Sequence, residues 1–151
     1  MINVISAMEL IEQTELRIGA IYKAWASKYE YDSDASFLFY RLYLEEMKHA
    51  NLARYCRNIL LKTVSRTKLV NEPIERNAVD IFELKAKEAK TLKDAIQTAL
   101  YVEVVMGEVY IQSGIAEVGD GFVKQSIAHM SADNHSEAIT AFLTSRGWKD
   151  F

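Results

Sequence analysis

The chain has 151 residues, of which 50% are hydrophobic and 26% are charged, and its formal net charge is -3. These values are ordinary for one soluble globular domain, so we treat residues 1–151 as a single domain. The small negative charge gives no reason to expect a nucleic acid or an anionic membrane surface as a partner. One proline and six glycines leave room for long helices and argue against an all-β fold.

The sequence carries no signal for membrane insertion or export. No apolar run reaches the roughly 18 residues that a membrane span needs. The N-terminus has neither the basic start nor the small-residue cleavage site of a secretory signal, so a cytoplasmic location is expected. The only cysteine, Cys56, has no partner for an internal disulfide, and its helical spacing predicts a buried thiol.

Two long helices are predicted in the first half of the chain. The first covers residues 6–29, and Ser6 and Glu9 at its start have the S-x-x-E spacing of a capping box. A polar turn follows, and the second helix covers residues 34–61. Because the turn between them is short, these helices are expected to be antiparallel neighbours.

The middle of the chain is predicted to be a long connection followed by a third long helix. Residues 63–75 are polar and indicate a loop, and residues 77–89 form a short helix. The third long helix starts at Thr91, with Asp94 as a second capping pair, and ends near Gly114.

A fourth long helix completes the pattern. It follows the turn at residues 119–121, runs to about Ser145 and is stopped by Gly147. The connection between the second and third long helices is about 30 residues, which is enough to cross the length of a bundle, whereas the other two connections are short. The sequence therefore predicts an all-α fold, a ferritin-like four-helix bundle with one long crossover connection between helices two and three.

Each predicted long helix carries a mostly apolar stripe with residues three and four apart, and polar residues lie near the middle of the stripes. The four stripes are Met8, Ile11, Glu15, Ile18, Tyr22, Trp25 and Tyr29; Phe39, Leu42, Glu46, His49, Ala53, Cys56 and Leu60; Ile96, Leu100, Glu103, Met106 and Tyr110; and Gln125, Ala128, Ala132, His135, Ile139 and Phe142. A buried carboxylate without a partner costs several kcal/mol. A divalent metal would compensate it, and a neutral imidazole is the other natural ligand.

An internal repeat strengthens the prediction of a metal site. Glu46 and His49 form an E-x-x-H pair on one helix face, a spacing that many helices contain by chance. The first and third long helices, however, share a further pattern, in which a glutamate is followed by a tyrosine two helical turns later. The pairs are Glu15 with Tyr22 and Glu103 with Tyr110, and the next helix carries Glu46 and His49 in the first half and His135 in the second.

With these residues the sequence resembles the ferritin-like superfamily, and within it the rubrerythrin-type di-iron domain, over nearly the whole chain. The resemblance implies two bridged iron ions. It makes Glu15 and Glu103 the terminal carboxylates, Glu46 a bridging carboxylate, and His49 and His135 the two imidazole ligands. The superfamily often pairs bundles, so a homodimer is also expected. Tyr22 and Tyr110 are either core aromatics or hydrogen-bond partners of ligand carboxylates.

The second half departs from the family pattern. Ala132 stands where a bridging glutamate should precede His135 by three residues. The neighbouring Asp133 is a further candidate ligand, although it lies about 100° around the helix, and a water could fill the gap instead. Met106 replaces another glutamate of the family, so iron movement driven by peroxide is not implied. The chain also lacks a rubredoxin module, so electrons would come from a separate donor protein.

Several other polar residues have simpler interpretations. His129 is expected at the surface, although it lies one turn before Asp133, and His135 could instead be a core histidine bonded to a carboxylate such as Glu46. Three more glutamates have spacings suited to solvent-exposed faces, namely Glu12, Glu45 and Glu108.

Three functions are consistent with this pattern. The first is an oxidoreductase that uses two iron ions to reduce peroxide or dioxygen, or that oxidises ferrous iron. The second is a metal-binding protein without turnover, with one ion of Zn, Mn or Fe at a degenerate site. The third is a metal-free interaction protein that has kept the bundle.

Overall fold

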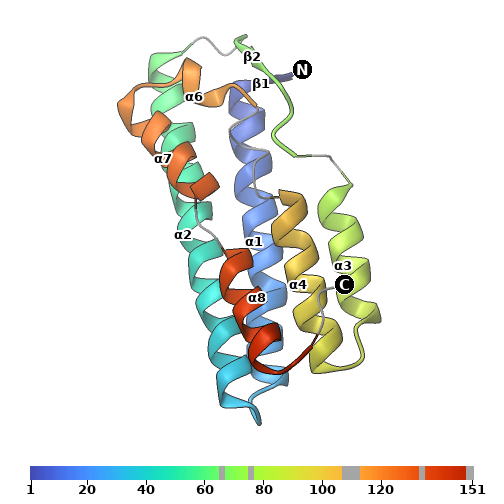
Figure 1. Ribbon diagram of the computed structural model, residues 1–151. Coiled ribbons are helices and arrows are strands. Elements are labelled where there is room, and N and C mark those ends of the chain that lie inside the picture. The colour runs from blue at the N-terminus through green and yellow to red at the C-terminus, as the bar shows by residue number, and fades with distance from the viewer. Residues whose placement is uncertain (65–66, 75–76, 107–112, 133–134, 149–151) are drawn as a thin grey trace.

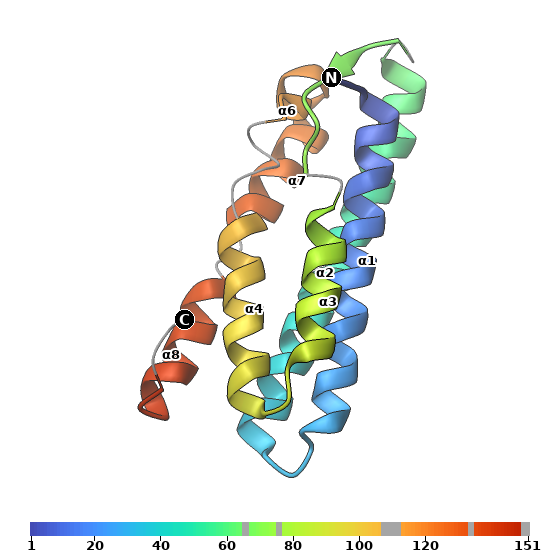
Figure 2. The same ribbon diagram turned by 90° about the vertical axis from the view of Figure 1, so that its right-hand side faces the viewer.

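The computed structural model is mostly helical, which confirms the all-α prediction. It describes residues 1–64, 67–74, 77–106, 113–132 and 135–148. Its two longest helices, α1 (Val4–Lys28) and α2 (Ser33–Thr63), run antiparallel and side by side (Figures 1 and 2). None of the helices in the described ranges is both long and apolar enough to cross a membrane.

The remaining helices pack on this pair. Helix α3 (Ala78–Glu88) lies against α1 and α4 (Leu92–Met106), as Figure 2 shows. The short α6 (Ile115–Val118) packs on α7 (Gly121–Ala132), and α7 packs on α2. Helix α8 (His135–Ser145) lies against α4 and α2. All these helices therefore form one bundle around α1 and α2.

The N-terminal end of α1 differs from the prediction. The helix begins at Val4, and the Asn3 side chain is its cap, because Asn3 Oδ1 accepts a hydrogen bond from the Ile5 backbone N–H at 2.8 Å. Ser6 therefore lies inside the first turn, and the predicted capping box with Glu9 is wrong. Asparagine is as good an N-cap as serine, so the two candidate starts could not be ranked by residue type alone.

The connection between α2 and α4 contains more structure than a loop. A strand, β2 (Leu69–Val70), pairs antiparallel with β1 (Ile2–Asn3), and Ile2 lies opposite Val70. This pairing holds residues 2–3 extended immediately before α1. Neither two-residue strand was predicted, and α6 was not predicted either, because elements this short carry no periodic signal.

Two predicted helix ends in the second half are confirmed. The Asp94 N–H donates to Thr91 Oγ1 at 3.1 Å and the Thr91 N–H donates to Asp94 Oδ2 at 3.2 Å, which is a reciprocal cap for α4. Gly147 has φ +66° just after α8, and the Trp148 N–H donates to the Leu143 carbonyl at 2.9 Å. A left-handed residue there is the common way to end a helix, and glycine adopts that conformation without strain.

The predicted fourth helix is two helices in the described ranges, α7 and α8, and the predicted stripe fails on α7. Gln125 and Ala128 are exposed. The buried side chains of α7 are instead Val123, Ser126, Ile127 and Met130. His135 and Ile139 on α8 are buried as predicted. The buried positions of α7 and those of α8 do not follow one regular helical spacing. A stripe predicted for one continuous helix could therefore match only one of the two helices.

The core is divided into two apolar clusters along the bundle. One surrounds Trp25 and Phe39, and the other surrounds Met8 and Leu60, nearer the chain's N-terminus. The stripes predicted for the first two helices are buried at every position. On both α1 and α2 the polar members of the stripe lie between the two clusters, so the fold places them in the middle of the bundle.

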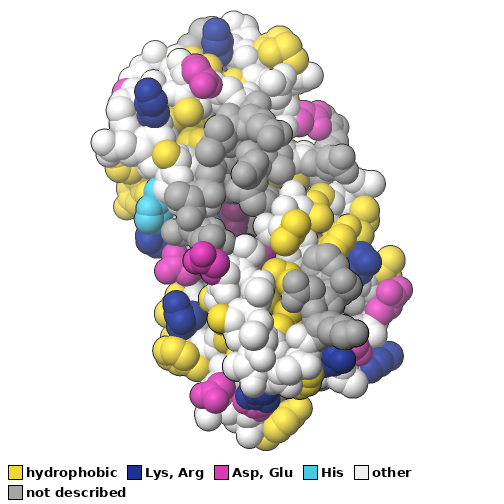
Figure 3. Space-filling view, in the orientation of Figure 1, with side chains coloured by type: hydrophobic (Ala, Val, Ile, Leu, Met, Phe, Trp, Pro, Cys, Tyr) yellow, Lys and Arg dark blue, Asp and Glu magenta, His cyan; other side chains and the backbone are white. Residues whose placement is uncertain are grey.

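The outer surface is mixed in character. Figure 3 shows acidic, basic and apolar side chains interspersed among the described residues of one face. Ion pairs also join separate elements. Arg17 of α1 pairs with Asp80 at 2.6 Å and with Glu83, both on α3, and Arg146 just after α8 contacts both carboxylate oxygens of Asp32, the N-cap of α2, at 2.7 and 2.9 Å.

Candidate metal centre

The five predicted ligands come from four helices and meet at the middle of the bundle. Glu15 on α1 and Glu46 and His49 on α2 are each 3% exposed. His135 begins α8 and is 9% exposed, and Glu103 on α4 is partly buried. The structure therefore brings together all five side chains that the repeat singles out.

Glu46 lies between the two imidazoles. Its Oε1 is 3.2 Å from His135 Nδ1, and its Oε2 is 3.8 Å from His49 Nδ1. His135 Nδ1 is also 3.1 Å from Glu103 Oε2, and His49 Nδ1 is 3.7 Å from Glu15 Oε2. The two rings are stacked, with their centroids 5.7 Å apart and their planes 16° from parallel. Each imidazole thus faces a carboxylate of its own and shares Glu46.

These residues form two overlapping groups that could each hold an ion. In Glu15, Glu46 and His49, and again in Glu46, Glu103 and His135, one ligand atom per residue lies within 4.8 Å of the others. Because Glu46 belongs to both groups, its two oxygens could each serve one ion.

Burial and mutual contact shift the proton affinities of the cluster. Burial raises the pKa of Glu15 to about 8, and the neighbouring Glu46 charge adds to the rise. Burial opposes the charged imidazoles, but bonding to Glu15 and Glu46 outweighs it and raises the pKa of His49 to about 11. Glu103 and Glu46 likewise raise the pKa of His135 to about 10. Without a metal the cluster therefore balances its charge with bound protons.

The donor set fits a transition-metal ion. Three carboxylates and two imidazoles suit Fe, Mn or Zn better than Mg or Ca, which prefer oxygen ligands alone. His135 Nε2 is buried and has no hydrogen-bond partner among the described residues. Because the ring turns Nδ1 to Glu46 and Glu103, an ion bound between these carboxylates would take Nδ1, and the costly unpartnered Nε2 remains open to a separate ligand.

Tyr22 makes the contact that its place on the stripe suggested. Its hydroxyl donates to Glu103 Oε1 at 2.6 Å. Burial and the nearby Glu103 charge raise the pKa of Tyr22 well above its usual value, so the hydroxyl keeps its proton and remains a donor. The bond fixes one oxygen of Glu103 and leaves Oε2 beside His135. Tyr22 therefore orients a candidate ligand from the opposite side of the bundle.

Other predicted residues fall outside the described part of the chain. Asp133, Tyr110 and Glu108 lie outside the described residues. Whether Asp133 replaces the carboxylate that Ala132 lacks, and whether Tyr110 repeats the role of Tyr22, therefore stay predictions. His129 is exposed on α7, as expected.

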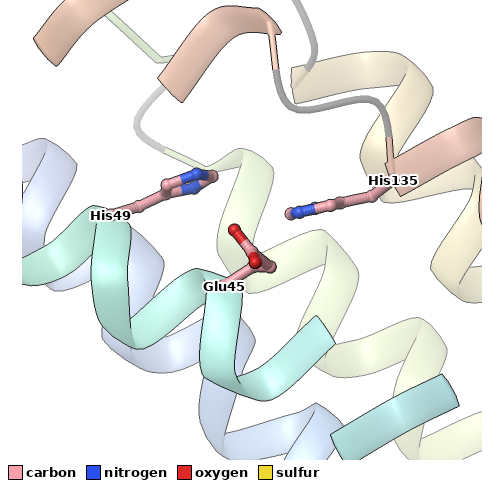
Figure 4. Close-up of side chains that lie close together, drawn as sticks. All are labelled: Glu45, His49 and His135. Atoms are coloured by element: carbon pink, nitrogen blue, oxygen red, sulfur yellow. The ribbon is translucent and has the colours of Figure 1, made fainter. Parts of the chain in front are cut away.

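Two glutamates that were expected to face solvent have other surroundings. Glu12 pairs with Arg57 at 2.6 Å, and its side chain is only 13% exposed, so that expectation is wrong. Glu45 is 40% exposed but offers a ligand atom within 4.8 Å of atoms of His49 and His135, and Figure 4 shows its carboxylate directed between the two rings. The spacing of Glu45 and His49, one helical turn, was a signal that could have revealed this group.

Comparison with protein-family models, curated proteins and solved structures finds no match to this chain. The function is therefore inferred from the geometry and chemistry of the cluster.

Proposed function

We propose that Glu15, Glu46, His49, Glu103 and His135 hold two iron ions and that the protein is a rubrerythrin-like oxidoreductase. The observation that carries the proposal is the position of Glu46, which belongs to two overlapping groups of candidate ligands and approaches both imidazoles. A carboxylate shared in this way is what a pair of neighbouring cations requires.

We also propose that the bundle is of the ferritin-like kind. Its support is the order of the helices: the short turn between α1 and α2 makes them a hairpin, and the connection from α2 to α4 is long and contains β2 and α3. Helices α7 and α8 together would take the place of the fourth helix. The homodimer and the separate electron donor belong to the same proposal.

Bound ferrous iron would supply electrons to peroxide or dioxygen. The chain's own residues would prepare the site for this chemistry. Anionic oxygens of Glu15, Glu46 and Glu103 favour the ferric over the ferrous state, and Tyr22 holds Glu103 in place through its 2.6 Å hydrogen bond. The apolar clusters on both sides of the centre limit the access of water.

The test is to load the metal-free chain anaerobically with Fe(II) and to add hydrogen peroxide. We expect ferric absorption to appear much faster than in buffer with the same iron. The His49→Ala variant should lose this reaction, whereas His129→Ala, which removes an exposed histidine of α7, should keep it. Oxidation no faster than in buffer would contradict the proposal.

A second candidate is a metal-binding protein without turnover. The observation that favours it is Ala132, which provides no carboxylate at the place of the second bridge. Three carboxylates with one divalent ion of Zn, Mn or Fe leave an excess charge of the same size as with two, so one ion balances the site as well as a pair does. Metal analysis separates the two candidates, since about two irons per chain support the first and about one zinc or manganese supports the second.

The third candidate is a metal-free interaction protein. The observation that favours it is that the raised pKa values of Glu15, His49 and His135 let bound protons balance the charge of the cluster. In that case Glu15→Gln would melt at the same temperature as the parent or higher, because a costly buried carboxyl would be gone, and neither protein would bind metal.

A further inference from the structure

A third group of candidate ligands lies on the solvent side of the centre. Glu45, His49 and His135 each offer one atom, and these atoms lie within 4.8 Å of one another. Figure 4 shows the three side chains converging on one space, with Glu45 and His49 extending from α2 and His135 from the start of α8. Glu45 is not among the five ligands proposed above.

A pocket lies beside this group and is lined by two of its members, Glu45 and His135. It has a volume of about 240 Å³ and lies between α2 and α8, with Arg41, Glu45 and Lys48 on one side and His135 on the other. The side chain of Glu45 is 40% exposed and that of His135 is 10% exposed. The pocket therefore leads from water past a carboxylate to a buried imidazole.

The ring of His135 is oriented so that one nitrogen is still available. Its Nδ1 lies 3.1 Å from Glu103 and 3.2 Å from Glu46. Its Nε2 is buried and has no hydrogen-bond partner among the described residues. An imidazole that turns one nitrogen to a carboxylate commonly offers the other to a metal ion. His49 also faces carboxylates with its Nδ1, at 3.7 and 3.8 Å.

We propose that Glu45, His49 and His135 form an outer cation site beside this pocket, which Glu45 and His135 line, and that divalent transition-metal ions reach the buried centre through it. Two nitrogens and one carboxylate oxygen select Fe(II), Co(II) or Zn(II) over Mg(II) and Ca(II). Lys48 lies 3.8 Å from Glu45, but an exposed pair of this kind is weak, so an ion can displace it. The outer site shares His49 and His135 with the buried centre and adds Glu45, and only the onward transfer of the ion depends on the function proposed above.

The first test is the rate at which the metal-free chain takes up Co(II), followed by its visible absorption in a stopped-flow instrument. Glu45→Gln should slow uptake about tenfold, because a carboxylate at the entrance concentrates cations. It should leave the final amount of bound Co(II) unchanged, because His49 and His135 also belong to the inner centre and the outer site is vacated once that centre is filled. Lys48→Gln should speed uptake. Glu9→Gln, an exposed glutamate of α1 far along the sequence, is the matched control and should behave like the parent. Equal rates for Glu45→Gln and the parent would overturn the proposal.

The second test separates the outer site from the inner centre. The double variant Glu15→Gln, Glu103→Gln removes two inner carboxylates with little change in shape, and circular dichroism would verify that it is folded. It should still bind one Co(II), and adding Glu45→Gln should abolish that binding. If Glu45→Gln abolishes Co(II) binding in the double variant while the iron-loaded parent protein fails to react with peroxide, the outer site is supported and the proposed function is wrong. If the double variant binds Co(II) equally well with and without Glu45, the outer site is wrong.

Discussion

At the scale of single residues, Glu103 shows how one neighbour defines the orientation of a candidate ligand. Its Oε1 accepts the Tyr22 hydrogen bond, and its Oε2 lies beside His135. Without the Tyr22 hydrogen bond the Glu103 carboxylate could rotate, and its Oε2 would then move away from the His135 ring. The tyrosine is therefore expected to matter for metal affinity although it donates no ligand atom.

Replacing Tyr22 with phenylalanine tests this role. The variant keeps the ring in the apolar cluster and removes only the hydroxyl, so we expect metal affinity to fall by about 10–100-fold. The free energy of unfolding should fall by about 1.5–3 kcal/mol, the range for a hydrogen bond to a charged group. Isothermal titration with Co(II) and thermal melting measure the two effects. Tyr40→Phe, at a side chain that is 49% exposed, should change neither, and a Tyr22→Phe variant with the parent's Co(II) affinity would contradict the role.

The raised pKa values predict how the stability of the metal-free chain depends on pH. His49, with a pKa raised to about 11, and His135, with a pKa raised to about 10, stabilise the fold fully below their ordinary value of 6.5 and lose that contribution as pH rises through the raised values. Glu15 acts in the same direction, because its pKa is raised from 4.5 to about 8 and its protonated form is the one that the fold favours. Stability should therefore fall between about pH 6 and about pH 9.

Thermal melting at these two pH values and constant ionic strength checks the prediction. Metal binding displaces the same protons, so the rise in melting temperature on adding Co(II) should be larger at the higher pH. The Glu15→Gln variant should show a weaker pH dependence than the parent. A metal-free parent that melts at a higher temperature near pH 9 than near pH 6 would be inconsistent with protons held by this cluster.

At the scale of helices, the close contact of α1 and α2 at Gly19 positions Glu46. A Cβ added at Gly19 would lie 2.5 Å from Met47 Cε and 3.2 Å from Glu46 Cβ. The Met47 methyl group can move, but Glu46 Cβ is attached directly to the backbone of α2. The absence of a side chain at Gly19 therefore lets the two helices approach beside the shared ligand.

Gly19→Ala tests this contact. Alanine favours a helix over glycine by about 1 kcal/mol, whereas overpacking costs about 1–3 kcal/mol, so we expect a net loss of stability or none. Because Glu46 would be pushed away from its place, Co(II) affinity should fall even if stability is unchanged. Titration with Co(II) measures the affinity, and thermal melting measures the stability. The control is Ala20→Gly, at an exposed position of α1, which shows the effect of helix propensity alone. Full Co(II) affinity in Gly19→Ala would mean that the contact does not position Glu46.

The helices also show what the sequence could and could not predict. The stripes of α1 and α2 were predicted at every position because each of these helices is long and unbroken, so one phase applies throughout. The stripe of α7 was wrong because the prediction continued the phase of α8 across two separate helices. The start of α1 was misplaced by two residues because Asn3 and Ser6 are both good caps and a distant strand, β2, holds Asn3 in place.

The meeting of the five candidate side chains was predicted from the sequence, and their role as ligands stays a prediction. The internal repeat located Glu15, Glu46, His49, Glu103 and His135, since residues of one stripe must face the bundle interior. Glu45 was missed because a residue next to a buried ligand is expected to point away from it. Its carboxylate reaches the space between the rings at the edge of the bundle, where α8 begins. The one-turn spacing of Glu45 and His49 was a partial signal, but the contact with His135 depends on how α2 and α8 are placed, which the spacing does not give.

At the scale of the whole molecule, two apolar clusters lie on either side of one polar layer. Each cluster excludes water from the layer, so the layer must neutralise its own charges with protons or with metal ions. The charge of the layer is therefore balanced by protons in the metal-free chain and by cations in the metal-loaded chain.

Anomalous X-ray scattering from crystals of the iron-loaded chain, recorded on both sides of the iron absorption edge, would locate the bound ions. We expect two iron peaks in the polar layer, one on each side of the Glu46 carboxylate, with Glu15 and His49 at one and Glu103 and His135 at the other. Data from the Glu46→Gln variant should show both peaks weakened or lost. A polar layer without any iron peak, in a crystal of the parent grown with excess Fe(II), would rule out an iron centre at Glu46.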